Sequence, residues 1–316
     1  MRDWCRVIVV VVGAMVVAAC GSHTSHSFKA SDADSIGQIP SATNGVIAYG
    51  SINEEQMFWT IQPDGGDRTR VHVDVPGYVG VPSWSPDGTR IIFGVTSFDD
   101  PHPKGGNYDI YVANADGTDP VRLTSEKVNH DPVWSPDGSR IAYVHGWDDQ
   151  QIWVMNADGS DRHLLSDIGV GTISPSWSPD RTKIAFVAFD ASSPEIYVMN
   201  ADGSDAERLT DRATHVADPA WSPDGRRIAF TSDGPEGPGI YVMAADGTGV
   251  EKLLDDPDPA NLRFAWSPDG TKMAVVSISG PDFNRTLYVL DVATREVSAI
   301  NDPGSFWGPS WQPLPN

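Results

Sequence analysis

The chain has 316 residues, and 43 acidic residues against 22 basic ones give it a formal net charge of −21 at pH 7. A surface this acidic repels nucleic acid and anionic lipid head groups, so the composition argues against both as partners. The acidity suits a soluble protein, or one whose partner is cationic or contains a metal.

Residues 1–19 predict a cleaved export signal. A basic start precedes Val7–Ala19, an uncharged and mostly apolar run of 13 residues. A spanning helix needs about 20 residues, so this run is too short to cross a bilayer and matches the apolar core of a secretory signal. The residues VAA before Cys20 resemble the lipobox of bacterial lipoproteins, which implies cleavage before Cys20 and its acylation. The alternative is an ordinary cleaved signal beside a chance cysteine.

Residues 20–44 predict a lipid-bearing cysteine followed by a flexible tether. The stretch is rich in Ser, Ala, Gly and Asp and shows no hydrophobic periodicity. As a random coil it would reach roughly 25–30 Å. Because Cys5 leaves with the signal, Cys20 would be the single cysteine of the mature chain, so no internal disulfide is expected. We therefore expect an exported protein, held by its lipid at the cell membrane or on the periplasmic side.

Residues 45–316 contain two motifs that alternate at a fixed period. The first, of the type WSPDG, carries Trp84, Trp134, Trp177, Trp221 and Trp266, and a PSWQP copy adds Trp311. These tryptophans recur every 43 to 50 residues. The second motif is IYVMNADGSDAERLT at 196–210, with close copies elsewhere. A period of about 40–45 residues is typical of four-stranded propeller blades.

Each repeat predicts four strands, A to D in chain order. Strand A carries the tryptophan, and Ser-Pro-Asp-Gly forms the turn to strand B. Strand B is apolar at consecutive positions, as expected when both of its faces are covered. Strand C is the IYVMN run, and an ADG turn leads to strand D. The A–B and C–D turns are short and uniform, so we expect the variable B–C and D–A loops to lie together on the opposite face.

The two ends of the repeat region predict how the ring closes. Val46–Gly50 reads as a B strand without a preceding tryptophan strand, and Pro309–Pro313 reads as an A strand without a following B strand. Together they complete one blade, which removes the exposed sheet edges of an open array. The prediction is an all-β, six-bladed propeller of four-stranded antiparallel blades, with the N-terminal strands (46–73) pairing with the Trp311 strand.

The string WSPDG…IAF…IYVMNADG…RLT resembles the TolB-type, WD-repeat-like β-propeller over nearly all of residues 45–316. The resemblance implies a six-bladed ring and a binding role in the cell envelope. The α/β domain that precedes the propeller in TolB proteins is not expected here, because residues 1–44 leave no room for it. Similar blades occur in prolyl-oligopeptidase-like enzymes and in oligogalacturonate lyases.

Ten aspartates fall in predicted turns and are interpreted as turn-formers, with a calcium loop as the alternative. They are Asp64, Asp87, Asp116, Asp137, Asp158, Asp180, Asp202, Asp224, Asp246 and Asp269. Arg181 replaces a turn glycine, at a cost of about 1 kcal/mol if its φ is positive. In the last C–D hairpin, Asp291 and Val292 replace the usual Asn-Ala-Asp-Gly. The repeat tryptophans are expected to pack between blades, with carbohydrate stacking as the alternative.

The candidate binding residues lie on the face of the variable loops, because binding residues concentrate on variable loops held by a rigid scaffold. They are Asp99, Asp100, His102, His130, Asp131, Trp147, Asp148, Asp149, Asp190, His215, Asp218, Asp233 and Asp282.

Catalytic chemistry has little support in the sequence. His130 with Asp131, and His215 with Asp218, precede the A strands of two blades and would form a weak metal site if they converged; the alternative is a solvated rim. The chain contains no G-x-S-x-G motif and no glycine-rich phosphate loop. We therefore expect no catalytic residues and no cofactor, with a divalent cation as the open alternative.

The sequence as a whole predicts a membrane-anchored, extracytoplasmic binding or scaffold propeller. It would be monomeric and would engage a protein, peptide or other cell-envelope partner through its acidic loop face. One alternative is a metal-dependent polysaccharide lyase- or hydrolase-like propeller enzyme. A sensor of small ligands or cations is another.

Overall fold

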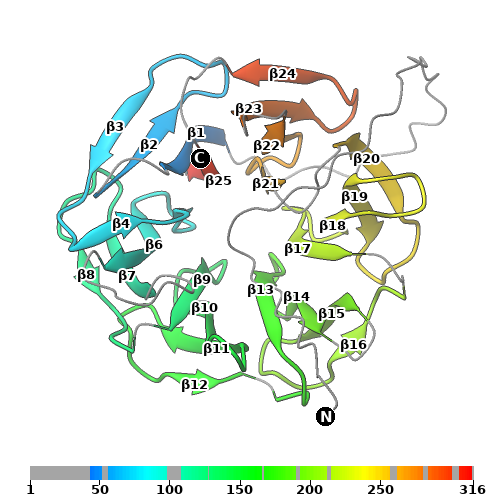
Figure 1. The fold of residues 1–316 in the computed structure, drawn as a ribbon, viewed down its shortest axis with the longest axis horizontal. Helices are drawn as coiled ribbons and strands as arrows, with labels where there is room; N and C mark the ends of the chain where they lie inside the picture. The colour runs from blue at the N-terminus through cyan, green and yellow to red at the C-terminus, as the bar shows by residue number, and fades with distance from the viewer. Residues whose placement is uncertain are drawn as a thin grey trace, which may run out of the picture.

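In the computed structural model, the protein is a ring of β-sheets arranged around a central axis (Figure 1). The structure describes residues 43–51, 56–97, 108–126, 128–165, 167–189, 193–211, 215–256, 262–279, 284–300 and 306–314. The predicted signal 1–19 lies outside these residues, as does the tether up to residue 42. Within the described ranges the regular secondary structure is entirely β-strand, and no helix there is long and apolar enough to cross a membrane.

The strands fall into six sheets, which we number as blades in the order of their B strands. Blade 1 combines β25 (Phe306–Leu314) with β1 (Thr43–Ser51), β2 (Met57–Ile61) and β3 (Thr69–His72). Blade 2 contains β4 (Gly77–Val79), β5 (Ser83–Trp84), β6 (Arg90–Ser97), β7 (Tyr108–Asn114) and β8 (Val121–Arg122). Blade 3 contains β9 (Asn129–Trp134), β10 (Arg140–His145), β11 (Gln151–Asn156) and β12 (His163–Leu164).

The remaining blades follow the same order from the axis outward. Blade 4 contains β13 (Thr172–Trp177), β14 (Lys183–Phe189), β15 (Pro194–Asn200) and β16 (Glu207–Arg208). Blade 5 contains β17 (Val216–Trp221), β18 (Arg227–Ser232), β19 (Gly239–Ala244) and β20 (Glu251–Asp255). Blade 6 contains β21 (Arg263–Trp266), β22 (Lys272–Ser279), β23 (Asn284–Asp291) and β24 (Val297–Ile300). The predicted six-bladed, four-stranded architecture is confirmed, except that strand A of blade 2 is divided into β4 and β5.

The two chain ends meet in blade 1. β1 pairs antiparallel with β25, and Ile47 lies opposite Trp311. Figure 1 shows the blue and red strands side by side. The first strand begins at Thr43, inside the segment that the sequence assigns to the tether. Asn44 donates a hydrogen bond from Nδ2 to Asp269 Oδ2 of blade 6 (2.9 Å), and Gln312 Nε2 donates to the Gly88 carbonyl of blade 2 (3.0 Å), so the closing blade is attached on both sides.

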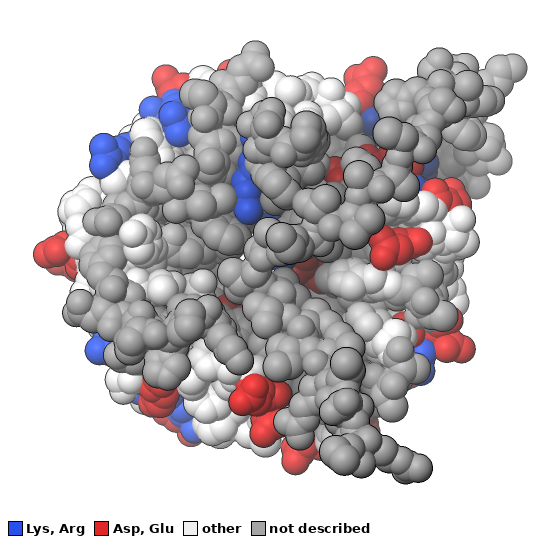
Figure 2. Space-filling model, in the orientation of Figure 1, with Lys and Arg blue, Asp and Glu red and all other residues white. Residues whose placement is uncertain are grey.

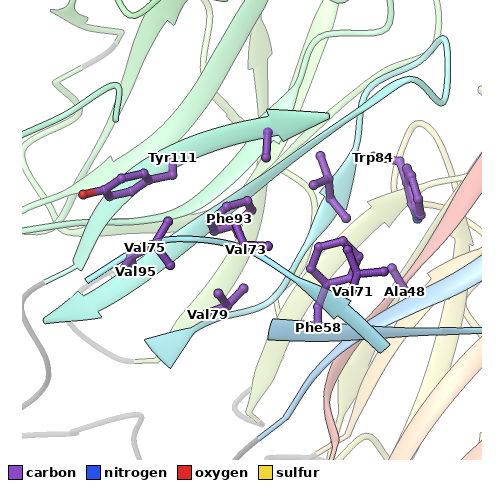
Figure 3. Packing of buried hydrophobic residues seen from close by; sticks show 12 residues of the cluster. Ala48, Phe58, Val71, Val73, Val75, Val79, Trp84, Phe93, Val95 and Tyr111 are labelled. Carbon is purple, nitrogen blue, oxygen red and sulfur yellow. The ribbon is translucent and has the colours of Figure 1, made fainter. Parts of the chain in front are cut away.

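The repeat tryptophans pack between neighbouring blades, as predicted. All six are between 5% and 9% exposed. Trp134, for example, lies in one buried cluster with Ile92 and Ile110 of blade 2 and with Ile141 of its own blade. Figure 3 shows the junction of blades 1 and 2, where Trp84 and Phe93 meet side chains of the first blade. A large ring at each junction hides apolar surface from both sheets, which stabilises the ring without disulfides.

The turn aspartates form hydrogen bonds within their turns. Asp137 Oδ1 accepts from the Ser135 hydroxyl (2.7 Å), the Ser139 N–H (3.0 Å) and the Ser139 hydroxyl (2.7 Å). In the C–D hairpin of blade 2, Asp116 accepts equivalent hydrogen bonds from the hydroxyl and N–H of Thr118, and these lower its pKa. The interpretation of this motif as a turn-former is confirmed at these positions. Arg181, in place of the turn glycine, has a positive φ of 66°, so the condition under which the sequence assigned it a cost is met.

The Arg-Leu-Thr motif of strand D holds a buried acid at the start of strand C. Arg208 Nη2 lies 2.9 Å from Glu195 Oε1, and the side chain of Glu195 is 1% exposed. The Thr210 hydroxyl donates to Glu195 Oε2 and accepts from the Ile196 N–H (2.9 Å). Asp109, Arg122 and Thr124 repeat the arrangement in blade 2. The motif therefore ties the outer edge strand to the sheet.

Candidate functional site

The loop face is the end of the ring that carries the B–C and D–A connections. On it, His130 and Asp131 belong to β9, and Asp218 belongs to β17. Trp147, Asp148 and Asp149 lie between β10 and β11, His215 directly precedes β17, and Asp233 directly follows β18. The predicted residues Asp99, Asp100, His102, Asp190 and Asp282 lie outside the described residues.

Three of the predicted residues are joined in a cluster on blade 3. His130 stacks on Trp147, with ring centroids 5.3 Å apart and planes at 17°. Its Nδ1 lies 3.2 Å from Asp131 Oδ2, and its Nε2 lies 3.2 Å from the amide nitrogen of Gln150. Asp148, beside Trp147, is exposed. The cluster thus combines an aromatic surface with carboxylates at one place.

Two residues of this cluster were not predicted. Tyr108 of blade 2 lies 5.9 Å from Trp147, centroid to centroid, so the aromatic surface crosses the junction between blades. Gln150 contacts the imidazole of His130. Tyr108 lies at a strand-C position that varies among the repeats, and this variation is the feature of the sequence that could have identified it as a site residue. Nothing in the sequence singles out Gln150.

Asp131, Ser174 and Asp218 occupy equivalent positions, three residues before the blade tryptophan, and all have positive φ (50°, 54° and 51°). The pairing register shifts at each of these points, which marks a bulge in the innermost strand of blades 3, 4 and 5. A bulge redirects a side chain relative to the regular pleat. Such strained, repeated positions concentrate at functional sites.

Arg263 of blade 6 connects these bulges, and the sequence did not identify it. Its Nη1 lies 3.0 Å from Asp218 Oδ2, and the Ser174 hydroxyl donates to Asp218 Oδ1 (3.4 Å). The side chain of Asp131 is 54% exposed. Partial desolvation raises its pKa, but the charges of His130 and Arg263 outweigh this effect and hold that pKa below its usual value. One guanidinium therefore acts on both predicted acids, Asp131 and Asp218.

The predicted metal ligands are engaged differently. His130 contacts Asp131, whereas Nδ1 of His215 is buried without a hydrogen-bond partner among the described residues. Among the residues that the structure places, no group of three or more His, Cys, Asp or Glu side chains could hold a metal ion.

The inner-strand serines join neighbouring blades: Ser310 Oγ accepts from the Trp84 N–H (3.3 Å), and Ser176 Oγ accepts from the Trp221 N–H (3.2 Å).

Comparison with known proteins places this ring in a family. A family profile described as the TolB beta propeller domain matches residues 26–169 and 100–315. The chain belongs to the TolB beta-propeller family. The crystal structure of TolB from Acinetobacter baumannii shares the fold, with a TM-score of 0.59 and 22% identity over 72% of this chain and 67% of that one.

Curated relatives match parts of the chain. The "Tol-Pal system protein TolB" of Anaeromyxobacter dehalogenans is 35% identical over 36% of this chain and 25% of its own length. The "Uncharacterized peptidase YuxL" of Bacillus subtilis is 33% identical over 35% of this chain and 18% of its own. The chain thus spans a quarter or less of the length of either relative, and the name peptidase belongs to the second protein alone.

Proposed function

We propose that this chain is an extracytoplasmic binding propeller of the TolB family that engages a protein or peptide of the cell envelope through its loop face. The observation that carries the proposal is the blade 3 cluster of His130, Asp131 and Trp147. Half-buried aromatic rings beside exposed carboxylates suit recognition, because they offer both apolar contact and directional charge.

Family membership supports the proposal from a second direction. One relative is named as a Tol-Pal system protein, and an envelope partner for this chain is consistent with that name. The acidic surface supports a partner with basic groups (Figure 2 shows acidic side chains spread around the periphery of one face). Complementary charge would speed association and exclude acidic competitors.

A charge-reversal pull-down tests the binding face. Asp148→Lys with Asp149→Lys should remove the partner that the wild-type protein captures from envelope extracts. The matched control reverses the charge of Glu207 and Glu296, two exposed acids away from the loop face, and should leave the captured partner unchanged. Equal capture by both variants would refute the assignment of the loop face.

We also propose that the chain is anchored through a lipid on Cys20 and acts as a monomer. Metabolic labelling with a fatty-acid analogue should mark the wild-type protein and not the Cys20→Ser variant, which should also lose its membrane fraction. Labelling of both would contradict the anchor. Light scattering of the lipid-free Cys20→Ser protein tests the monomer, and a mass of two chains would contradict it.

The enzyme alternative makes a separate prediction. We propose that binding needs no resident cofactor and that the loop face is not catalytic. Elemental analysis of the purified protein, with His130→Ala and His215→Ala as comparison, tests this. A stoichiometric divalent metal that both variants lose would overturn the proposal in favour of a metal-dependent propeller enzyme.

A further inference from the structure

The opposite end of the ring, which we call the turn face, carries a cavity between blades 5 and 6. Its volume is about 260 Å³, and its lining includes Asp224 and Arg227 of blade 5 and Asp291 and Ala293 of blade 6. Pockets for drug-sized ligands measure about 300–1,000 Å³, so this one suits a smaller molecule.

Two departures from the repeat meet at this cavity. In the A–B turns of blades 2, 3, 4 and 6, a Thr or Ser hydroxyl two residues after the turn aspartate donates to that aspartate. Blade 5 has Arg226 there instead. Within the part of the chain that the structure describes, Asp224 consequently receives hydrogen bonds from the Ser222 hydroxyl (2.6 Å) and the Arg226 N–H (3.1 Å) alone, both at Oδ1.

The second departure is the C–D hairpin of blade 6. Asp291 stands where the other C–D hairpins have Asn, Ala or, in blade 1, Gln62. Its Oδ1 accepts from the N–H groups of Ala293 (3.1 Å) and Thr294 (2.9 Å). Among the described residues, Oδ2 of Asp224 and Oδ2 of Asp291 receive no hydrogen bond. Each carboxylate therefore keeps an acceptor oxygen for another group.

Both carboxylates are ionised at neutral pH. Burial raises the pKa of Asp224, but the hydrogen bonds from Ser222 and Arg226 and the nearby charge of Arg227 bring it below its usual value. The Thr294 N–H lowers the pKa of Asp291 in the same direction.

Arg227 supplies the opposite charge. Its guanidinium lies 5.5 Å from the centroid of the Trp266 ring and makes no hydrogen bond or close ion pair with the described residues. An arginine held over an aromatic ring keeps its planar fork of N–H donors available for a carboxylate.

We propose that the turn-face cavity binds a small zwitterion of the α-amino acid type, with its carboxylate on Arg227 and its ammonium between Asp224 and Asp291. Charge-assisted hydrogen bonds of both kinds are the strong ones in proteins. Pro223, Val292 and Ala293 give the cavity apolar wall, which suits a short aliphatic side chain. The site is independent of the loop face and of the partner proposed for it.

The test titrates L-alanine into the ¹⁵N-labelled protein and follows chemical shifts. L-Alaninamide, which lacks the carboxylate, and N-acetyl-L-alanine, which lacks the ammonium, provide the two half-ligands. We expect saturable binding of L-alanine, and binding of each half-ligand weaker by about tenfold or more. Absence of saturable L-alanine binding, or equal binding of either half-ligand, overturns the proposal.

Variants locate the site. Arg227→Gln should weaken L-alanine binding by about tenfold or more. Arg90→Gln is the matched control, because Arg90 begins strand B of blade 2 and its guanidinium lies 4.9 Å from the Trp134 centroid; it should leave the affinity unchanged. Ala293→Trp, at an exposed turn residue, should block the cavity without removing a charge. Equal affinities in Arg227→Gln and Arg90→Gln, or unchanged binding in Ala293→Trp, would place the ligand elsewhere.

Discussion

The closure of the ring can be tested by adding one methyl group at Gly88. This glycine lies in the A–B turn of blade 2 with a φ of +67°. A Cβ on it would lie 2.2 Å from the Pro313 carbonyl oxygen of β25, the strand that ends the chain. No real Cβ approaches a backbone oxygen so closely, so Gly88→Ala must displace either the turn or the closing strand.

Gly138→Ala provides a control with the same backbone conformation. Gly138 occupies the equivalent turn of blade 3 with a φ of +69°, and its Cβ would meet nothing nearer than Pro86 Cδ at 3.6 Å. Both variants bear the cost of a left-handed alanine, about 1–2 kcal/mol, partly offset by a less flexible unfolded chain. Only Gly88→Ala adds the overlap, for which overpacking data suggest about 1–3 kcal/mol more.

Equilibrium denaturation in urea, followed by tryptophan fluorescence and circular dichroism, measures the difference. We expect Gly88→Ala to lower the free energy of unfolding by about 1–3 kcal/mol more than Gly138→Ala does. If the two variants lose the same stability, Pro313 does not lie against the turn of blade 2, and the closure of the ring through β25 is wrong.

Three further predictions concern the blades themselves. Trp266→Phe should destabilise the protein by about 1 kcal/mol more than Trp134→Phe, because Trp266 Nε1 donates to the Ala220 carbonyl (3.2 Å) whereas Trp134 Nε1 has no partner among the described residues. Paired urea denaturation curves measure this difference in the free energy of unfolding. A larger loss in Trp134→Phe would contradict the prediction. Glu195→Ala should lower the free energy of unfolding by about 3–5 kcal/mol, because Arg208 and Thr210 lose the buried carboxylate that they contact. A loss below about 1 kcal/mol, by the same assay, would show that the contacts of Glu195 with Arg208 and Thr210 are dispensable. The free energy of unfolding should be constant from pH 7 to about pH 5 and fall below about pH 4, because the turn carboxylates, Asp137 and Asp180 among them, have lower pKa values in the folded than in the unfolded protein and become protonated as the pH drops. In acid titrations of the melting temperature, Asp137→Asn should make this fall shallower. An unchanged profile would contradict the assignment of the acid sensitivity to the turn carboxylates.

The sequence predicted which face carries much of the candidate site, but it did not predict the side-chain contacts within that site. The alternation of strands placed His130, Asp131 and Trp147 on one face, because loops of variable length lie there together. Their contacts depend on side chains from other blades. Tyr108 comes from blade 2, and Arg263, which reaches Asp218, comes from blade 6.

The cavity on the turn face illustrates the same limit. The sequence analysis identified the Asp291 hairpin as a departure from the repeat but did not single out Arg226, and the two lie about 65 residues apart in the chain. Only the packing of blade 5 against blade 6 places Asp224, Arg227 and Asp291 around one space.

The sequence by itself determined the architecture, because each repeat buries its tryptophan only against a neighbouring copy and the two unmatched half-blades can complete each other. The tertiary structure alone decided which side chains meet between blades. Blade junctions are formed by residues some 40 or more positions apart, and the orientation of each side chain there depends on local bulges and turn lengths. Periodicity records neither, so the ring was predictable from the sequence, whereas the contacts between blades at the candidate sites were not.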